Sequence, residues 1–375
     1  MKSLVTASPN LDDFAALLDQ ADRQHHGALL VLGCDQNHWP KEDLDALLTR
    51  TNTPVLGGIF PAIAINDQRH EHGAIILGLE ERPDVARIAG MSDPHADYEA
   101  ELLGQLDRWQ GLEMESTLVV LVDGLASRIS ALVEDLFFVF GLANNFVGGG
   151  AGSLSFEQKP CIISSGRVEA DVALVVKLPR SSTIGVTHGW SGISDTLEVT
   201  EADRNVIKTL NWQPAFESYK AIVDTHSPTP ITREDFFEVA KSYPLGLQKL
   251  DGEMVVRDPL MVQNDNELVC VGEVPQGAFV RVLNGNAASL LEAAREARRI
   301  VGADQPDSDR QLLLFDCISR ALFLGPGIEQ ELKALTEGEP SVGAFTLGEI
   351  ANSGRDYLEF LNKTTVLARI GKPSR

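Results

Sequence analysis

The chain has 375 residues, with 32 Lys and Arg against 54 Asp and Glu, so its formal net charge is −22. A chain this acidic lacks the basic footprint that binds nucleic-acid phosphates, and anionic membrane surfaces repel it, so we expect neither nucleic acid nor membrane insertion. With 43% hydrophobic and 23% charged residues, it has the composition of a globular protein whose length predicts about two domains.

Short apolar runs alternate with amphipathic segments along the first half of the chain, a pattern typical of α/β structure. A helix is predicted to begin after Asn10, which can cap it, because its apolar residues fall at helical spacing. These are Leu11, Phe14, Leu17 and Leu18. The other elements predicted before residue 150 are strands at 28–32, 55–56 and 117–122 and helices at 42–49 and 127–140.

The rhythm changes after residue 161. Short β-rich runs separated by Gly or Asp predict antiparallel hairpins or a mixed sheet up to residue 210. The elements predicted beyond it are helices at 214–223, 233–241, 287–300 and from residue 317, and strands within 254–282 and at 312–315, 342–345 and 364–368. No short-period repeat is evident.

The turn- and Pro-rich stretch 224–230 is the predicted domain junction. It divides the chain into domains at 1–224 and 225–375. The predicted fold class is α/β, in the mixed α+β sense, with two domains whose mixed sheets are flanked by helices.

The N-terminus and the cysteines predict a cytoplasmic protein. Residues 1–9 hold no apolar segment of signal-peptide length, and no stretch approaches the ~18 apolar residues that span a bilayer. The cysteines lie far apart without a CxxC pair, which predicts neither a zinc site nor a disulfide framework. They are Cys34, Cys161, Cys270 and Cys317.

Three short motifs suggest chemistry but depart from the pattern that the chemistry needs. The glycine run 148–152 completes neither a dinucleotide fingerprint nor a P-loop, so we interpret it as a close-packed strand or turn. The run 189–193 ends in Ile where a nucleophile elbow has its last glycine. His70 and His72 form half of a metal site without a third ligand nearby, in a segment typical of a solvated loop.

His188 ends a β-rich run beside Gly189 and Trp190. A histidine in this setting can line a pocket with the tryptophan, titrate near neutral pH, or bind a metal or haem iron. It can equally be a histidine that is hydrogen-bonded at a strand end. Both interpretations stay open here.

Cys317 and Arg320 follow the apolar strand 312–315 at the start of a helix. Ligands of α/β sheets favour that location, a thiol there can have a lowered pKa, and an arginine can hold a carboxylate or phosphate. Alternatively, the cysteine is a small buried hydrophobe and the arginine pairs with an internal acid. Further along, Glu349 and Asn362 can contribute hydrogen bonds to a polar ligand, or serve as a turn acid and a strand-opening cap.

The ordered strings of this chain resemble the FIST (F-box and intracellular signal transduction) family. The strings FDCISR at 315–320, PSVGAFTLGEI at 340–350 and NKTT at 362–365 are similar to the C-terminal FIST domain. Those similar to the N-terminal FIST domain are PVLGG at 54–58, GGGAG at 148–152, VTHGW at 186–190 and PAFESY at 214–219. Two more, YPLGL at 243–247 and VRDPL at 256–260, match in order between them, so the resemblance spans nearly the whole chain.

The resemblance implies a sensory module of signal transduction. Such proteins are thought to bind small ligands, amino acids being the usual suggestion, and to inform a partner such as a histidine kinase, a cyclase or a chemoreceptor. We therefore expect a cytoplasmic small-ligand sensor in which Arg320 holds an anionic group. Cys317, Glu349 and Asn362 are expected around that group.

Two alternatives remain beside the sensor. Some family members are described as haem proteins that sense nitric oxide, and His188 would then be the haem ligand of this chain; we expect no other cofactor. The chain could instead be an uncharacterised enzyme with Cys317 as its nucleophile. Its base would come from the other half of the chain, because no histidine follows His226.

Overall fold

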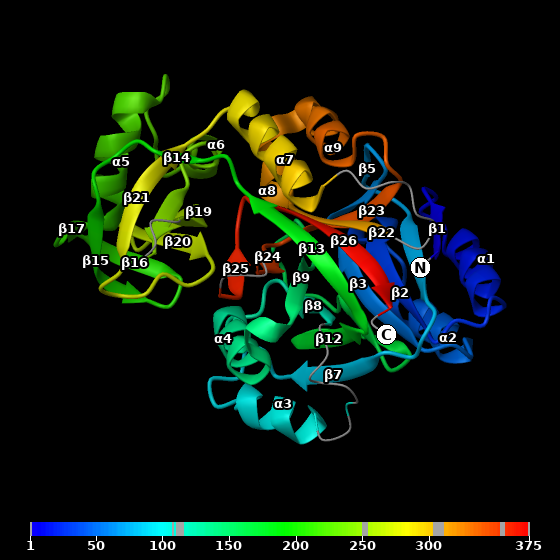
Figure 1. Ribbon diagram of the computed structural model, residues 1–375. Helices are drawn as coiled ribbons and strands as arrows, with labels where there is room; N and C mark the ends of the chain where they lie inside the picture. Colours follow the sequence, from blue (N-terminus) through cyan, green and yellow to red (C-terminus); the bar gives the residue numbers. More distant parts are fainter. Residues whose placement is uncertain are drawn as a thin grey trace.

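The computed structural model describes residues 2–106, 109, 116–249, 254–302, 311–352 and 357–373. Within these residues the strands form three six-stranded sheets and one eight-stranded sheet, with helices packed on their outer sides (Figure 1). Each six-stranded sheet contains one parallel pair among antiparallel neighbours. The predicted mixed α/β fold is therefore confirmed.

The three six-stranded sheets are built from one unit that occurs three times along the described chain. Each unit has an outer strand, a helix, a central strand, one or two further helices, a strand parallel to the central one, a β-hairpin and a closing strand. The first unit is β1 (Lys2–Thr6), α1 (Leu11–Asp22), β2 (Ala28–Cys34), α2 (Lys41–Arg50), β3 (Val55–Phe60), β4 (Ala62–Ile65), β5 (Gln68–His70) and β6 (Ala74–Leu79). The second is β7 (Asp84–Ala89), α3 (Tyr98–Leu106), β8 (Thr117–Asp123), α4 (Ile129–Phe140), β9 (Asn145–Ala151), β10 (Ile162–Ser164), β11 (Arg167–Glu169) and β12 (Val172–Leu178). The third is β13 (Arg180–Thr187), α7 (Ala287–Val301), β22 (Gln311–Cys317), α8 (Ile318–Leu324), α9 (Ile328–Thr336), β23 (Ser341–Thr346), β24 (Glu349–Ala351), β25 (Glu359–Leu361) and β26 (Thr365–Pro373).

The hairpins are exchanged between the units. In each sheet the outer, closing, central and parallel strands come from one unit, and the hairpin beside them comes from another. The first unit supplies β4–β5 to the third sheet, the second supplies β10–β11 to the first, and the third supplies β24–β25 to the second. This cyclic exchange joins the N-terminal and C-terminal parts of the chain into one body.

A glycine in each parallel strand lets that strand lie close against its central strand. Gly57, Gly148 and Gly343 face the central strands β2, β8 and β22. A Cβ at these positions would lie only 1.9 or 2.0 Å from a facing backbone oxygen. The glycine run at 148–152 is thus required by strand packing, as the sequence predicted.

An additional lobe is inserted into the third unit, between β13 and α7 (Figure 1). Its antiparallel strands close into a ring, because β18 pairs with both β19 and β21. Its elements are β14 (Ser191–Gly192), β15 (Leu197–Asp203), β16 (Val206–Leu210), β17 (Gln213–Pro214), α5 (Ala215–His226), α6 (Phe236–Ala240), β18 (Leu245–Gln248), β19 (Met254–Gln263), β20 (Glu267–Val271) and β21 (Phe279–Asn284). Helix α6 is shorter than the predicted 233–241, because the backbone N–H of Asp235 donates to Oγ1 of Thr232 and a turn precedes the helix.

The predicted junction at 224–230 lies inside this lobe, where it includes the last residues of α5 and the turn after them. Three of the four sheets formed by the described residues combine strands from both sides of residue 224. The division into 1–224 and 225–375 is therefore not a division in space.

The central strands β2, β8 and β22 are buried along their whole length. At their carboxyl ends, β8 leads into residues 124–128 and β22 leads directly into α8. Both exits point toward the inserted lobe. In the described parts of the chain, no helix combines the length and the apolar character that crossing a membrane requires.

Candidate functional site

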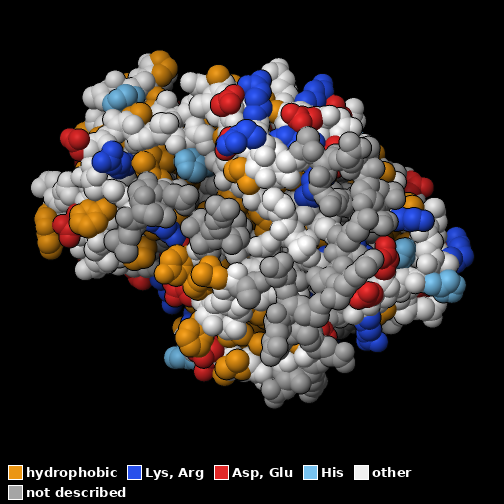
Figure 2. Space-filling model, in the orientation of Figure 1, with side chains coloured by type: hydrophobic (Ala, Val, Ile, Leu, Met, Phe, Trp, Pro, Cys, Tyr) orange, Lys and Arg blue, Asp and Glu red, His pale blue; other side chains and the backbone are white. Residues whose placement is uncertain are grey.

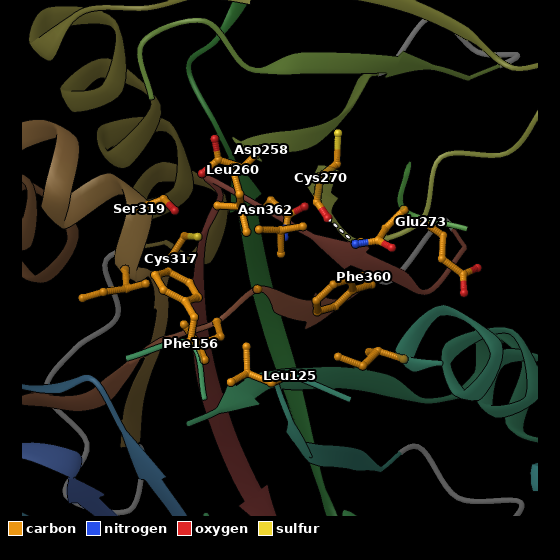
Figure 3. Close-up of a pocket in the computed structure, with 18 of the residues that line it drawn as sticks. Leu125, Phe156, Asp258, Leu260, Cys270, Glu273, Cys317, Ser319, Phe360 and Asn362 are labelled. Atoms are coloured by element: carbon orange, nitrogen blue, oxygen red, sulfur yellow. Dashed lines mark hydrogen bonds between the residues drawn. The ribbon is translucent and has the colours of Figure 1, made fainter. Parts of the chain in front are cut away.

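A cavity of about 230 Å³ lies where the inserted lobe meets the second and third units (Figure 3). Its wall comes from β19 and β20 of the lobe, the start of α8, the segment 124–130 after β8, and the hairpin β24–β25. The carboxyl ends of two central strands thus reach one cavity, and ligands of α/β proteins bind at such strand ends.

Most of the wall is apolar. Figure 3 shows Phe156 and Leu125 on one side of the cavity and Phe360 on another. Phe237 and Leu260 of the inserted lobe complete the apolar surface. Such a wall suits the apolar body of a small organic molecule and leaves recognition to the few polar groups among it.

Asn362 is the most informative polar residue of the wall. It follows β25, is only 1% exposed, and its side chain lines the cavity. Among the residues that the structure describes, neither its Oδ1 nor its Nδ2 has a hydrogen-bond partner. A buried amide without partners costs free energy, because it has lost its hydrogen bonds to water. A ligand in the cavity would supply them.

Asp258 of β19 brings a second open polar group to the cavity, near Ser319 of α8 (Figure 3). The carboxylate is fully buried, and burial raises its pKa against the opposing effect of the Lys363 ammonium. The Nζ of Lys363 lies 3.2 Å from Oδ2 as an ion pair that lacks hydrogen-bond geometry. Ser319 and Lys363 both stabilise the charged form of this carboxylate, yet neither of its oxygens has a hydrogen bond of standard geometry among the described residues, so lone pairs remain for a ligand.

Cys317 also lines the cavity but is not an activated thiol. It is 3% exposed, and burial, reinforced by the charge of Glu349, raises the pKa of the thiol far above its usual value. Of the two interpretations of Cys317, the structure supports the small buried residue, because the strand end is buried and acidic groups lie near the thiol. No histidine belongs to the described residues of the wall, so the structure does not support Cys317 as a nucleophile.

Arg320 lies outside the cavity wall and is fully buried. Its Nε donates to Glu331 at 2.7 Å and lies 3.4 Å from a carboxylate oxygen of Asp316. Its other nitrogens donate to backbone carbonyls, those of His188, Lys363 and Leu290. The expected role as an anion clamp for a ligand is therefore replaced by the alternative, an arginine paired with internal acids.

Glu349 is likewise buried away from the cavity. Its Oε1 accepts from the Thr346 hydroxyl at 2.7 Å, and its Oε2 accepts from the Thr364 backbone N–H at 3.3 Å. Burial raises the pKa of this carboxyl well above its usual value. Its partners fix the turn between β23 and β24, so it supports Asn362 indirectly and does not face a ligand.

His188 and Trp190 lie beside the Arg320 cluster. The Nδ1 of His188 accepts from the Trp190 backbone N–H at 2.9 Å, and the indole N–H of Trp190 donates to the Lys363 carbonyl at 3.1 Å. Burial, assisted by the charge of Arg320, lowers the pKa of His188 to about 4. The structure thus places a hydrogen-bonded histidine at a strand end.

The surroundings of His188 do not fit a haem. An axial ligand presents a ring nitrogen to a cavity that holds the macrocycle. His188 does not line the cavity described above, and one of its ring nitrogens is already bonded to the backbone. His70 and His72 border a separate, open cleft, and the described residues contain no group of three His, Cys, Asp or Glu placed to hold a metal.

Two of the six residues proposed from the sequence, Cys317 and Asn362, meet in the cavity. Asp258 was missed, although the sequence carries a signal: an acidic side chain follows Arg257 and directly precedes Pro259 within a β-rich run. Its place near Asn362 depends on the packing of the inserted lobe against the third unit, where Asp258 pairs with Lys363.

Comparison with known families gives two matches that together cover most of the chain. The model of the FIST N domain matches residues 4–213, and the model of the FIST C domain matches residues 215–352. The curated proteins contain no match to this chain. The border between the two matches falls between β17 and α5 of the inserted lobe, whose sheet both domains build. The chain therefore belongs to the FIST family, whose domains are associated with signal transduction and small-ligand sensing.

Proposed function

We propose that this protein is a sensory protein that binds a small metabolite in the cavity between the inserted lobe and the three-sheet body, and that signals through a separate partner protein. The main support for the proposal is the buried amide of Asn362, which lines the cavity and has no hydrogen-bond partner at either polar end in the described part of the chain. Apolar packing would avoid the free-energy cost of this amide, so ligand recognition is the role that explains it.

The position of the cavity supports a sensory role. A ligand there contacts the lobe, α8, the segment after β8 and the hairpin β24–β25 at once. A ligand that binds one arrangement of these four segments more tightly shifts the population toward it. A change in the arrangement of these four segments is therefore the means by which ligand binding would be communicated to a partner.

A groove of about 880 Å³ lies on the surface next to the cavity, and we assign the partner protein to it. It shares Phe360 and Glu273 with the cavity, and acidic side chains such as Glu134 and Asp135 line it beside Phe138, which is 72% exposed. Hydrophobic side chains gather below the inserted lobe in Figure 2. A histidine kinase, cyclase or chemoreceptor with a basic, partly apolar surface would complement this groove and the net charge of −22.

The test is a thermal-unfolding screen of the purified chain against neutral, anionic and cationic metabolites, followed by calorimetric titration of each hit. A ligand at 100 times its Kd stabilises the protein by about 2.7 kcal/mol. Ligand binding should also slow hydrogen exchange in β19, β25 and the C-terminal half of α4. Binding without any change outside the cavity wall would contradict the sensory role.

The site is tested by filling the cavity. Ala126 lies just before α4 and lines the cavity. Ala131 lies in the first turn of α4 and does not line it. We expect Ala126→Leu to weaken binding of a hit at least tenfold and Ala131→Leu to leave it unchanged. Equal affinity for the wild type and Ala126→Leu would place the ligand elsewhere.

A further inference from the structure

The polar atoms that face the cavity specify the head group of its ligand. Asn362 offers two N–H donors on Nδ2 and an acceptor on Oδ1, and Asp258 offers two carboxylate acceptors. Ser319 adds a hydroxyl at the same end of the cavity (Figure 3). The other polar residues of the wall are Ser127, Ser130, Asn205 and Glu273, and Asn205 already donates to the Cys270 carbonyl. Among the described residues of the wall, the buried polar side-chain atoms without a hydrogen-bond partner are those of Asn362 and Asp258, so recognition is assigned to this end.

An anionic head group fits these atoms poorly. The charged side chains among the described residues of the wall are Asp258 and Glu273, and no Lys, Arg or His is found there. The nearest cations are engaged elsewhere: Lys363 donates to the Lys241 carbonyl and pairs with Asp258, and Arg257 donates to the carbonyls of Glu273 and Phe360. A carboxylate or phosphate would face two acids and gain no cation.

An ammonium head group satisfies only half of the site. It can donate to Asp258 and to Oδ1 of Asn362, but it leaves both N–H groups of Nδ2 without an acceptor. Lys363 and Arg257, which lie behind the two acids, also offset the negative charge that would attract a cation. The wall therefore favours an uncharged group that both donates and accepts.

We infer that the cavity recognises a neutral primary carboxamide attached to a compact apolar body. The amide carbonyl accepts from Nδ2 of Asn362, one amide N–H donates to Oδ1 of the same side chain, and a second N–H donates to Asp258. The apolar body packs between Phe156, Phe237 and Phe360. This inference rests on the proposed function and names the ligand class of the same site.

The cavity volume limits the size of the body. An apolar cavity of about 150 Å³ binds benzene, so a cavity of about 230 Å³ suits a single ring with a short substituent. Benzamide, benzoate and benzylamine share one such ring and differ only in the head group. They therefore serve as matched probes.

The experiment is calorimetric titration of the full chain with each of the three probes at pH 7. Benzamide should bind at least tenfold more tightly than benzoate and benzylamine. The inference is overturned if either charged probe binds as tightly as benzamide, or if benzamide does not bind at millimolar concentration.

A variant at Asn362 tests whether its side chain causes the preference for benzamide. Asn362→Asp keeps the shape and removes the N–H donors, so the affinity for benzamide should fall at least tenfold. Asn352→Ala is the matched control, because Asn352 is equally buried but both of its polar ends are bonded, to Phe146 and Asn144. This control should lower the melting temperature and leave the affinity for benzamide unchanged. An unchanged affinity in Asn362→Asp would contradict the inference.

The outcomes also separate this inference from the proposed function. If the metabolite screen finds an anionic ligand whose binding Ala126→Leu abolishes, the sensory cavity stands and the carboxamide assignment fails. If no compound of any class binds, the proposed function fails as well.

Discussion

The Arg320 cluster and the cavity wall are two buried polar regions that lie close together and differ in how their polar groups are satisfied. In the cluster, the guanidinium bonds to Glu331 and to three backbone carbonyls, so its hydrogen-bonding capacity is consumed within the protein. In the cavity wall, the Asn362 amide and the Asp258 carboxylate keep open capacity. The cluster therefore stabilises the fold, and the wall is available to a ligand.

This difference shows that residue type alone does not identify a binding group. An arginine and a cysteine at a strand end suggested a ligand clamp, yet both are enclosed by the fold. A neutral asparagine after the last hairpin is the better candidate, because its partners are missing. Four variants test the contrast, in order of expected effect on stability.

The largest effect is expected from Arg320→Leu. The substitution leaves the buried carboxylates of Glu331 and Asp316 without their cation and removes a donor from the His188 carbonyl, so the free energy of unfolding should fall by about 3–5 kcal/mol. Urea denaturation measures it. Arg299→Leu is the control, because Arg299 forms an exposed ion pair with Glu296 and its loss should hardly move the midpoint. A small effect at Arg320 would contradict its structural role and would make it a candidate ligand-binding residue again.

The second prediction concerns pH. The folded-state pKa of His188 is about 4 against its usual 6.5, so the unfolded chain binds more protons between these values. The stability that this neutral histidine contributes above pH 6.5 is lost as the pH falls toward 4, by up to about 3 kcal/mol. His188→Asn keeps an acceptor for the Trp190 N–H and removes the titration. The difference in unfolding free energy between wild type and variant should therefore shrink as pH falls across this window, and a constant difference would contradict the assignment.

A smaller effect on stability is expected from Gly348→Ala, which tests how tightly the cavity wall is packed. Gly348 has a φ of +86°, and a Cβ there would lie 2.4 Å from the Phe360 ring and 3.1 Å from Nδ2 of Asn362. We expect a loss of about 1–3 kcal/mol of stability together with weaker ligand binding. Gly338→Ala isolates the backbone strain, because Gly338 has a φ of +80° and open space around it. Equal melting temperatures for the two variants would show that contact with the wall is unimportant.

The smallest effect, and the one of unusual sign, is expected from Asn362→Leu. Leucine has a similar size and removes an unpartnered buried amide, so the unliganded protein should be unchanged or more stable by up to about 1 kcal/mol. Ligand binding should be lost. Thermal unfolding with and without a hit from the screen measures both. A clear loss of stability would mean that the amide has structural partners within the fold.

The three repeated units show which features of a fold hydrophobic periodicity does not predict. Most predicted helices and strands are present near their predicted positions, because local hydrophobic periodicity and glycine placement specify them. The three units were not recognised, since their shared features are strand order and exchanged hairpins. The signals that the units share within the sequence are short: an apolar run in each central strand and a glycine in each parallel strand, such as Gly148 and Gly343.

The sequence by itself determined the mixed α/β class and the membership of the FIST family. It also indicated Cys317 and Asn362 as site residues, and both line the cavity. Only the tertiary structure decided which polar groups are satisfied. Arg320 finds a partner in the carbonyl of His188, 132 positions away in the chain, and Asp258 meets the cavity through the inserted lobe. Hydrogen-bond satisfaction depends on such distant neighbours, and no local pattern of residues encodes it.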